Sequence, residues 1–440
     1  MKKVAFRNLG CKVNEYEIEH MQQRMAEKGY FIVPFDAKAD IYVINTCTVT
    51  NIADRKSRQM LHRAKKENPE AIVVAVGCYV QSDPEKAAKD QAVDIIIGNN
   101  QKSKIADIID EYFENHAVSI ETVSDLTKPV EYEEMQIDHT EEHTRAFIKI
   151  QDGCNQFCSY CEIPIVRGRI RSRSLESILT ECRNLADNGY SEVVLTGIHL
   201  SSYGLDGTGI SYNEAAKDGA FTNKALLEVI TEVSKIDGIK RIRLGSLEPR
   251  LITEEFLKIL TKVDKICPHF HLSLQSGSNE TLKRMNRHYT TAEYANSVKL
   301  LRKYFDDPAI TTDVIVGFPQ ETQEEFEESC KFVKEMGFFE LHVFKYSRRK
   351  GTVADKMAGQ IPENVKDERS EKLIAIGNKL SDEFRKRYEG RQVEVLFEEK
   401  KGTSMVGHTR EYIMVGTLSD DVKKGQIAAM KINGESLYFL

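Results

Sequence analysis

Apolar residues follow two spacings in the first part of the chain. Short runs rich in Val and Ile, typical of buried strands, alternate with longer segments whose apolar positions recur every three to four residues, as in amphipathic helices. The predicted strands are Val4–Leu9, Ile41–Asn45, Ile72–Val76 and Ile95–Ile97, and the predicted helices are Asn14–Gly29, Ile52–Lys66 and Lys102–Phe113. Such alternation forms parallel sheets with right-handed crossovers, so residues 1–115 are expected to form a small doubly wound α/β domain.

Residues 116–143 interrupt this pattern with a polar, acidic stretch, and residues 116–139 are expected to be a solvated linker. A second alternation of strands and helices begins at Thr144. Its predicted strands are Arg145–Ile150, Glu192–Leu195, Arg241–Leu244, His269–Leu274, Thr311–Val316 and Glu340–Lys345. Six further strand–helix units are too many to extend the first sheet. Residues 140–371 are therefore expected to form a partial (β/α)6 barrel with its functional residues at the C-terminal strand ends.

The last segment, residues 372–440, changes character after a predicted helix that ends near Lys386. The predicted strands there are Val393–Phe397, Tyr412–Val415, Ile427–Ile432 and Leu437–Leu440. Glycine-containing turns and no helical pattern separate these strands, which predicts a small antiparallel β-barrel.

Composition and charge narrow the class of protein. No apolar run approaches the ~20 residues that a membrane helix needs, and the N-terminal apolar stretch stops at Arg7, so a cytoplasmic protein is expected. The net charge of −6 means that any RNA contact must come from a local basic patch. In a reducing cytoplasm, clustered cysteines among the nine present are better interpreted as metal ligands or catalysts than as disulfides.

The most specific pattern is a CxxxCxxC run, Cys154, Cys158 and Cys161, directly after a predicted strand. Three thiolates on one short loop can hold three irons of a cubane cluster and leave the fourth iron free to bind a substrate. Phe157 and Tyr160 are placed to pack over such a cluster and limit water. A zinc site is the alternative, although zinc usually pairs CxxC with a distant second pair, which this sequence lacks.

Three further cysteines, Cys11, Cys47 and Cys78, each stand at the end of a predicted strand of the first sheet. Parallel strand ends share one edge, so these thiols are expected to converge into a second three-thiolate site. The alternative is that each is a small buried apolar residue. That interpretation is preferred for the other three, Cys182, Cys267 and Cys330, whose spacing is not typical of a metal site.

The cysteine loop followed by six β-α units resembles the radical S-adenosylmethionine superfamily. Both cysteine trios, in this order and ahead of a small β-module, resemble the methylthiotransferase family over nearly the whole chain. The shared motifs are Asn45-Thr46-Cys47-Thr48-Val49, Leu195-Thr196-Gly197-Ile198-His199, Gln275-Ser276-Gly277-Ser278 and Asp313-Val314-Ile315-Val316-Gly317-Phe318-Pro319. The run Gly10-Cys11-Lys12-Val13-Asn14 is similar to the branch that acts on N6-threonylcarbamoyladenosine at adenosine 37 of tRNA. The tail resembles the RNA-binding TRAM module.

This resemblance implies roles for both trios and for several partners. Cys154, Cys158 and Cys161 would bind a radical-generating [4Fe–4S] cluster, and Cys11, Cys47 and Cys78 an auxiliary [4Fe–4S] cluster that carries the sulfur to be delivered. Two S-adenosylmethionine molecules would be used per turnover, one to methylate the sulfur and one to yield the radical that activates adenine carbon 2. The substrate would be tRNA, and a reducing partner such as flavodoxin or ferredoxin would be needed. Glu162, after the third loop cysteine, departs from the aliphatic residue usual in the family.

Other residues are candidates for contacts with cofactor or RNA. Polar residues and one glycine at predicted barrel strand ends suit S-adenosylmethionine binding: Gly197, Ser246, Glu248, Gln275, Ser276 and Asp313. An arginine run after the cluster loop, Arg167, Arg169, Arg171 and Arg173, favours contact with phosphate or cofactor over an ion-paired edge, and Arg167 is assigned to the cofactor. Arg55, Lys56 and Arg58 open a predicted helix after Cys47; that they face the substrate and that they form an ordinary polar helix face are equally favoured. Tyr412 and Phe397 are interpreted as core residues rather than as residues that stack on bases.

Three functions stay open at this point. The favoured one is methylthiolation of N6-threonylcarbamoyladenosine in tRNA. The second is methylthiolation of another target, either isopentenyladenosine in tRNA or a ribosomal-protein aspartate. The third is a non-catalytic iron–sulfur protein for electron transfer or RNA binding, which conflicts with the three-cysteine loop because an electron carrier gains nothing from an open iron.

Overall fold

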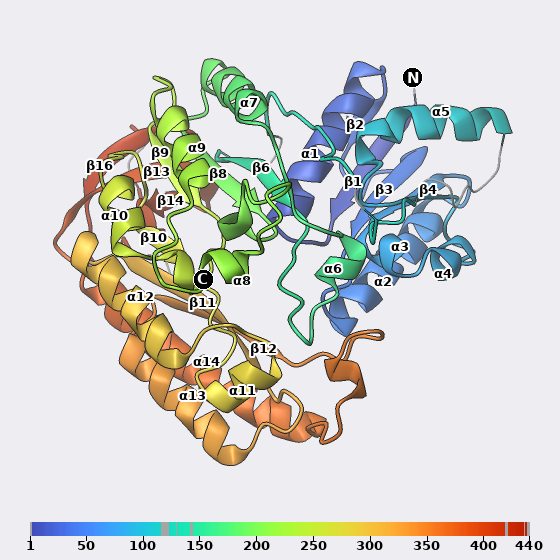
Figure 1. The fold of residues 1–440 in the computed structure, drawn as a ribbon. Coiled ribbons are helices and arrows are strands. Elements are labelled where there is room, and N and C mark those ends of the chain that lie inside the picture. The colour runs from blue at the N-terminus through green and yellow to red at the C-terminus, as the bar shows by residue number, and fades with distance from the viewer. Residues whose placement is uncertain are drawn as a thin grey trace.

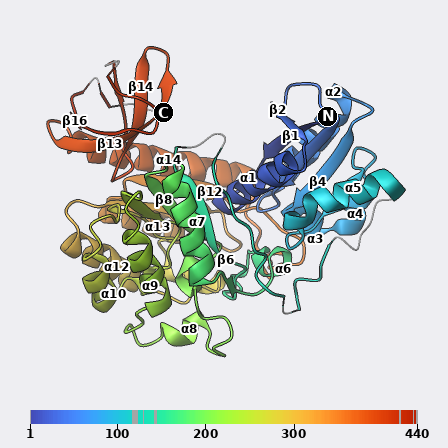
Figure 2. The ribbon, with the colours of Figure 1, turned by 90° about the horizontal axis from the view of Figure 1, so that it is seen from above.

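The chain forms a five-stranded sheet flanked by helices, then a larger open barrel, then a four-stranded antiparallel sheet (Figure 1). The computed structural model describes residues 2–115, 123–128, 130–140, 144–418, 421–434 and 436–437. The N-terminal sheet and the C-terminal strands lie on opposite sides of the molecule in Figure 1 and in Figure 2. Among the described residues, no helix combines the length and apolarity that crossing a membrane requires.

The N-terminal sheet has the strand order β2-β1-β3-β4-β5, and every pair of neighbouring strands is parallel. Its strands are β1 (Lys3–Asn8), β2 (Phe31–Val33), β3 (Ile41–Thr46), β4 (Ile72–Gly77) and β5 (Ile95–Ile97). Its helices are α1 (Lys12–Glu27), α2 (Asn51–Glu67), α3 (Cys78–Ser82), α4 (Pro84–Ala88) and α5 (Ile105–Asn115). This confirms the doubly wound prediction and adds β2, which the sequence pattern does not predict.

Strand residues alternate between two apolar layers, one on each face of this sheet. Val43 and Val74 pack with α1 and α5, whereas Ile44 and Ala75 pack with α2, α3 and α4. Both faces are therefore buried, which is why the strands are nearly continuous apolar runs.

Six parallel strands in chain order form the barrel. They are β6 (Ala146–Asp152), β8 (Glu192–Gly197), β9 (Arg241–Leu244), β10 (His269–His271), β11 (Ala309–Val316) and β12 (Glu340–Lys345). Full ladders join β6-β8-β9 and β10-β11-β12, and single bridges such as Ile242 to Ile266 join the two groups. No pairing in the described part of the chain links β12 back to β6, so the barrel is open on that side. A short strand, β7 (Arg171–Ser172), pairs antiparallel with β6.

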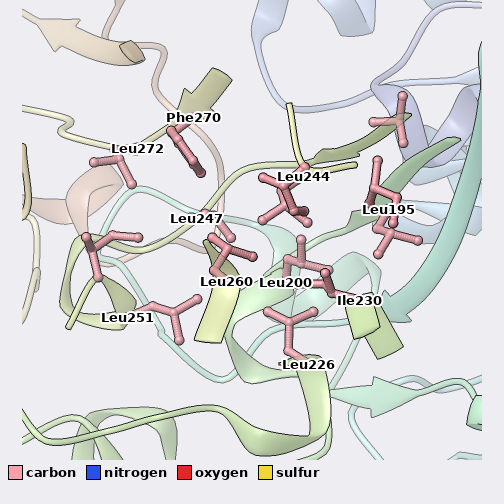
Figure 3. Packing of buried hydrophobic residues seen from close by; sticks show 14 of the residues in the cluster. Leu195, Leu200, Leu226, Ile230, Leu244, Leu247, Leu251, Leu260, Phe270 and Leu272 are labelled. Atoms are coloured by element: carbon pink, nitrogen blue, oxygen red, sulfur yellow. The ribbon is translucent and has the colours of Figure 1, made fainter. Parts of the chain in front are cut away.

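Longer helices cover the outside of the barrel: α7 (Leu175–Asp187), α9 (Lys224–Ser234), α10 (Glu254–Leu260), α12 (Thr291–Tyr304), α13 (Gln323–Met336) and α14 (Glu363–Lys386). Three short helices lie in the segments that follow β6, β8 and β10: α6 (Ile163–Val166), α8 (Tyr212–Ala215) and α11 (Asn279–Arg284). The largest apolar core lies between strands and helices. Figure 3 shows part of it, where Leu195 of β8 and Leu244 of β9 lie near Leu226 of α9 and Leu260 of α10. The partial barrel predicted from the sequence is confirmed.

The connection between the first sheet and the barrel is less solvated than its charge predicts. Residues 130–140 run in an extended path, and Met135 and Ile137 are buried in the barrel core. The Tyr16 hydroxyl of α1 donates to the Met135 carbonyl at 2.6 Å, and the Ile137 amide donates to Glu181 of α7 at 2.6 Å. Burial of Met135 and Ile137 and these two hydrogen bonds thus hold the segment against the barrel, although most of its residues are polar.

The C-terminal sheet has the order β15-β14-β13-β16, with all pairs antiparallel. Its strands are β13 (Gln392–Lys401), β14 (Ser404–Thr409), β15 (Met414–Thr417) and β16 (Ile427–Lys431). β14 is absent from the sequence prediction. Leu437 forms a single bridge with Val415, and the remainder of the strand predicted at Leu437–Leu440 lies outside the described residues. Helix α14 packs on the barrel through Leu373 and on the C-terminal sheet through Phe384.

Candidate functional site

The loop after β6 directs three thiols into one cavity. Gly153 starts the loop with a φ of +70°, and a Cβ at this position would lie 1.9 Å from the Arg169 carbonyl oxygen, so only glycine fits. Cys154, Cys158 and Cys161 all line a cavity of about 190 Å³. Burial and the neighbouring Cys158 thiol raise the pKa of the Cys154 thiol to about 12. Burial therefore favours the protonated form of the Cys154 thiol when no metal is bound.

Barrel strand ends supply the other walls of this cavity. Ser246, Glu248 and Gln275, predicted as cofactor residues, all line it. Gln275 has a φ of +68°, unusual for a non-glycine residue, and its amide donates to the Asp313 carbonyl at 2.9 Å. Glu248 accepts hydrogen bonds from the Tyr212 hydroxyl at 3.1 Å and the Arg250 amide at 2.9 Å. The structure therefore brings these three residues to the thiols.

A second cavity of about 230 Å³ lies beside the first and reaches the N-terminal sheet. Asp313 lines it, and Tyr160 and Gln275 line both cavities. Val49 and Thr50, shortly after Cys47, form its far wall. The two cavities thus lead from the loop cysteines towards the cysteines of the first sheet.

Three predicted cofactor residues are not part of either cavity lining. Arg167 is fully buried and its guanidinium is bound to Glu17, Asp152 and Asn14, so the assignment of Arg167 to the cofactor is wrong. Ser276 is buried, and its hydroxyl lies 3.3 Å from that of Ser329. A Cβ at Gly197 would lie 2.9 Å from the Gln151 side chain, so packing on β6 accounts for this glycine.

The rest of the arginine run is also mostly internal. Arg171 donates to the Arg167 carbonyl at 2.9 Å, and Arg173 forms an ion pair with Glu181. Arg169 alone is exposed, with its guanidinium over the Phe157 ring. The ion-paired edge, the less favoured of the two alternatives, is what the structure contains.

The strands that precede the second cysteine trio end at one edge of the N-terminal sheet. β1, β3 and β4 are neighbours in register, with Asn8 opposite Asn45 and Thr46 opposite Gly77, so their C-terminal ends share one edge. Cys11 caps α1, Cys47 follows β3, and Cys78 opens α3. Burial raises the pKa of Cys47 to about 12, and the nearby Cys78 and Cys11 thiols add to this shift.

Backbone and amide contacts position this second trio. Gly77 has a φ of +99°, and a Cβ there would lie 2.8 Å from the Thr46 carbonyl oxygen, so glycine is required where β4 turns into α3. The Asn99 side-chain amide donates to the Cys78 sulfur at 3.5 Å. Asn14 places its side-chain amide 3.1 Å from the Thr46 carbonyl and its oxygen 3.7 Å from the Cys11 sulfur.

The spacing of the thiols does not suit a single zinc ion. Thiolates bound to tetrahedral zinc at about 2.3 Å lie about 3.8 Å from one another. Of the residues that the structure describes, only His271, Asp313 and His342 bring three ligand atoms within 4.8 Å of one another. Neither cysteine trio, as described, is that tightly grouped.

A buried ion-pair network joins the two cysteine sites. Glu17 of α1 forms ion pairs with Arg167 at 2.8 Å and with Lys149 of β6 at 2.9 Å, and with Lys102 as well. Burial opposes ionisation of Glu17, but these three cations outweigh it and hold the pKa of the carboxyl well below its usual range. Arg167 also pairs with Asp152, two residues before Cys154. Its side chain therefore links α1, which follows Cys11, to the start of the Cys154 loop.

A second contact between the sites uses Glu162, the residue that departs from the family pattern. Glu162 is buried next to Cys161 and pairs with Arg349 at 3.0 Å. The Thr48 hydroxyl, next to Cys47, donates to Glu162 at 3.3 Å, and Arg349 also binds Thr48. Glu162 thus anchors the cluster loop to the N-terminal sheet.

Two family models match the chain, the Radical SAM superfamily over residues 148–333 and the Uncharacterized protein family UPF0004 over residues 3–98. A curated relative, Threonylcarbamoyladenosine tRNA methylthiotransferase MtaB of Bacillus subtilis (strain 168), is 43% identical over 98% of this chain and 94% of its own length. The chain belongs to the radical S-adenosylmethionine methylthiotransferase family. Another relative, tRNA-2-methylthio-N(6)-dimethylallyladenosine synthase of Thermodesulfovibrio yellowstonii, is 36% identical over 98% of this chain and 95% of its own length.

A solved structure supports the fold of this methylthiotransferase-family chain. The radical S-adenosylmethionine methyltransferase TsrM from Kitasatospora setae, with cobalamin and a [4Fe-4S] cluster bound, matches with a TM-score of 0.58 and 14% identity. The match covers 80% of this chain and 74% of that one. At this identity the likeness concerns the fold alone.

Radical S-adenosylmethionine family membership implies a [4Fe–4S] cluster and S-adenosylmethionine, and the cavity beside the cysteine loop fits both. Besides three thiols, it contains two groups that sequence reasoning missed. His199 Nε2 is buried and has no hydrogen-bond partner in the described part of the protein, so it is available to a ligand. The Arg287 guanidinium lies 3.2 Å from the Cys158 sulfur, where its charge offsets a thiolate. No spacing signal in the sequence points to Arg287.

The remaining candidates are packing residues or exposed residues of a helix. Cys182, Cys267 and Cys330 are buried, which confirms their role in packing. The Tyr412 ring stacks on His269 and on His408 and is partly buried in the core of the C-terminal sheet. Phe397 is buried. Arg55 and Lys56 are exposed on the first turns of α2.

Proposed function

We propose that this protein converts N6-threonylcarbamoyladenosine at adenosine 37 of tRNA into its 2-methylthio derivative. The observation that carries the proposal is a pair of adjacent cavities, one lined by the three loop cysteines and the other by residues that closely follow Cys47. A threonylcarbamoyladenosine tRNA methylthiotransferase is a 43% identical relative of this chain. Forming a C–S bond at an unreactive adenine carbon needs both a radical and a source of sulfur, which accounts for two sites in one chain.

In this proposal Cys154, Cys158 and Cys161 hold a [4Fe–4S] cluster and leave one iron without a protein ligand. When bound there with S-adenosylmethionine, the cluster supplies the electron that cleaves the cofactor to a 5′-deoxyadenosyl radical. Ser246 and Glu248 border the cavity in which the cofactor would lie and are suited to orient its polar groups. Their position at the C-terminal strand ends, the usual ligand face of such barrels, supports this role.

Cys11, Cys47 and Cys78 hold the second [4Fe–4S] cluster, which carries the sulfur to be transferred. Their convergence on one sheet edge and the hydrogen bond from Asn99 to Cys78 support this assignment. The reaction consumes two S-adenosylmethionine molecules, and a small electron carrier such as flavodoxin or ferredoxin reduces the first cluster.

Contact with tRNA is proposed at the rim of the cavities and at the C-terminal sheet. Exposed Arg55 and Lys56 follow Cys47 on α2, and exposed Arg169 follows the first cluster loop. Exposed cations beside a cavity suit phosphate binding. The strand pattern and position of residues 372–440 support a TRAM-like RNA-binding module. The other proposed units are the N-terminal domain (residues 1–115), the linker (116–139) and the radical S-adenosylmethionine core (140–371).

Nucleoside mass spectrometry tests this function. tRNA from cells that lack the protein is expected to contain N6-threonylcarbamoyladenosine without its 2-methylthio derivative, and the native chain is expected to restore the derivative. Restoration of a methylthiolated isopentenyladenosine instead would point to the alternative tRNA target. No change in any tRNA nucleoside would contradict the proposal and direct attention to a ribosomal-protein aspartate.

Cysteine variants test the two sites separately. Cys158→Ala is expected to abolish 5′-deoxyadenosine formation by the reconstituted protein. Cys47→Ala is expected to retain part of the cofactor cleavage and to lose sulfur insertion. Cys330→Ala, which removes a buried packing thiol, is the matched control and should retain both. Full methylthiolation by either of the first two variants would refute these assignments.

A further inference from the structure

Lys12 follows Cys11 at the start of α1, a helix that packs against β6 and β8 of the barrel. Its side chain is accessible to solvent, yet protein groups from several elements surround it. The charges that act on it most strongly are those of Arg243 on β9, Arg145 just before β6, and Asp313 on β11. Lys12 therefore faces the interior of the open barrel beside the second cysteine site.

The ammonium group of Lys12 has no partner. Among the described residues, it forms no ion pair and no side-chain hydrogen bond. Its two cationic neighbours are both paired, Arg243 with Glu192 at 2.9 Å and Arg145 with Glu398 at 3.4 Å. An unpaired cation that protein surrounds but solvent can reach is suited to bind an anionic group of a ligand.

Asp313 is the one acid among the groups that act on Lys12 besides the Cys11 thiol. It is already engaged, because His271 Nε2 lies 3.2 Å from its carboxylate. With His342 these residues have the spacing of a metal site, since their ligand atoms lie within 4.8 Å of one another. Binding of a cation there is opposed by the charge of Lys12, and the ammonium group of Lys12 is itself left to bind an anion.

The proposed substrate has one anionic group on its base, the carboxylate of the threonyl moiety. The substituent on N6 and the reacting carbon 2 share the same edge of the adenine ring. A group that recognises this substituent must therefore lie close to the site that delivers sulfur, as Lys12 does next to Cys11. Asp313, whose charge acts on Lys12, lines the second cavity, which lies beside the first cysteine loop.

We propose that Lys12 is a specificity-determining residue whose ammonium group binds the carboxylate of the threonylcarbamoyl substituent. This inference rests on the proposed function and adds to it the group that distinguishes an acidic N6 substituent from an apolar one. Such a pair discriminates between the two substituents, because only the acidic one gives the ammonium group a charge-assisted hydrogen bond.

The test compares two anticodon stem-loop RNAs with the reconstituted holoenzyme. One carries N6-threonylcarbamoyladenosine and the other carries its methyl ester, which removes only the negative charge. The native protein is expected to show a kcat/KM for the ester that is roughly 10- to 100-fold lower, the range for a hydrogen bond between charged groups. Lys12→Gln is expected to reduce this ratio to nearly one, and Lys12→Arg to retain most of it.

Lys66→Gln is the matched control, because Lys66 is exposed in the last turn of α2, at the end of that helix away from Cys47. It should discriminate between the RNAs as the native protein does. Equilibrium binding of the two RNAs gives the same comparison for a variant that has lost turnover. Full discrimination by Lys12→Gln, or none by the native protein, would overturn the inference. Failure of the native protein to methylthiolate the acidic RNA at all would instead refute the proposed function.

Discussion

Replacing Arg167 by Met should destabilise the protein because it removes one member of the buried network between the cysteine sites. The guanidinium forms ion pairs with Glu17 at 2.8 Å and Asp152 at 3.2 Å and donates to Asn14 at 2.6 Å. Breaking a buried ion pair by removing one partner typically costs 3–5 kcal/mol. Each carboxylate here keeps another cation, such as Lys149 at 2.9 and 2.7 Å, so we expect about 3 kcal/mol, the lower end of that range.

The assay is urea denaturation of the metal-free chain, followed by circular dichroism, with the midpoint of the first transition compared among variants because a chain of several units need not unfold in one step. Arg169→Met is the matched control, because it changes the same residue type two positions away, where the side chain is exposed and its guanidinium lies over the Phe157 ring. Its effect should stay within about 0.5 kcal/mol.

A double-mutant cycle with Glu17→Gln should reveal a coupling energy of roughly 1–3 kcal/mol between Arg167 and Glu17. Equal stability of the Arg167 and Arg169 variants would refute the reasoning. So would a variant of Arg167 that is fully stable but has lost affinity for S-adenosylmethionine, because that result would return Arg167 to the cofactor site.

Two further predictions concern pH and the second contact between the sites. Burial, with the nearby cations Arg287 and Arg250, lowers the pKa of His199 to about 3. The unfolded chain takes up this proton near pH 6.5, so the stability gained from neutral His199 is complete above pH 6.5 and is lost as the pH falls towards 3. His199→Gln should therefore weaken the loss of stability between pH 7 and pH 5 by about 2 kcal/mol in urea denaturation, and an unchanged pH dependence would contradict this. Glu162 and Arg349 should show a coupling energy of about 1–3 kcal/mol in a double-mutant cycle, and additive effects would show that their contact at 3.0 Å does not stabilise the domain interface.

The fold could be predicted in most elements because its strands and helices carry strong periodic patterns. The exceptions are short or mixed segments. β2 is a three-residue edge strand with an exposed Phe31, and it is too short to show alternation. β14, Ser404–Thr409, contains a glycine and polar residues, and its pairing with β13 sets its conformation more than its own propensity does.

The candidate site could be predicted where its residues adjoin a strand end or share a loop. Both cysteine trios met that condition. Arg167 did not, because its partner Glu17 lies 150 positions away in the sequence, and only the tertiary fold shows that the charge is compensated. Arg287 is brought to Cys158 from 129 positions away, and no local pattern marks it. Sequence position thus marks candidate ligands, whereas the compensation of charge requires the structure.

Iron analysis of the anaerobically reconstituted protein tests the central claim most directly. Two cubane sites predict about eight irons per chain for the native protein, four per cluster. A variant with Cys154, Cys158 and Cys161 all changed to Ala should keep about four irons, and so should a variant with Cys11, Cys47 and Cys78 changed. A different result would contradict the claim of two separate cluster sites: the native chain binds only about four irons, one triple variant loses all of them, and the other triple variant loses none.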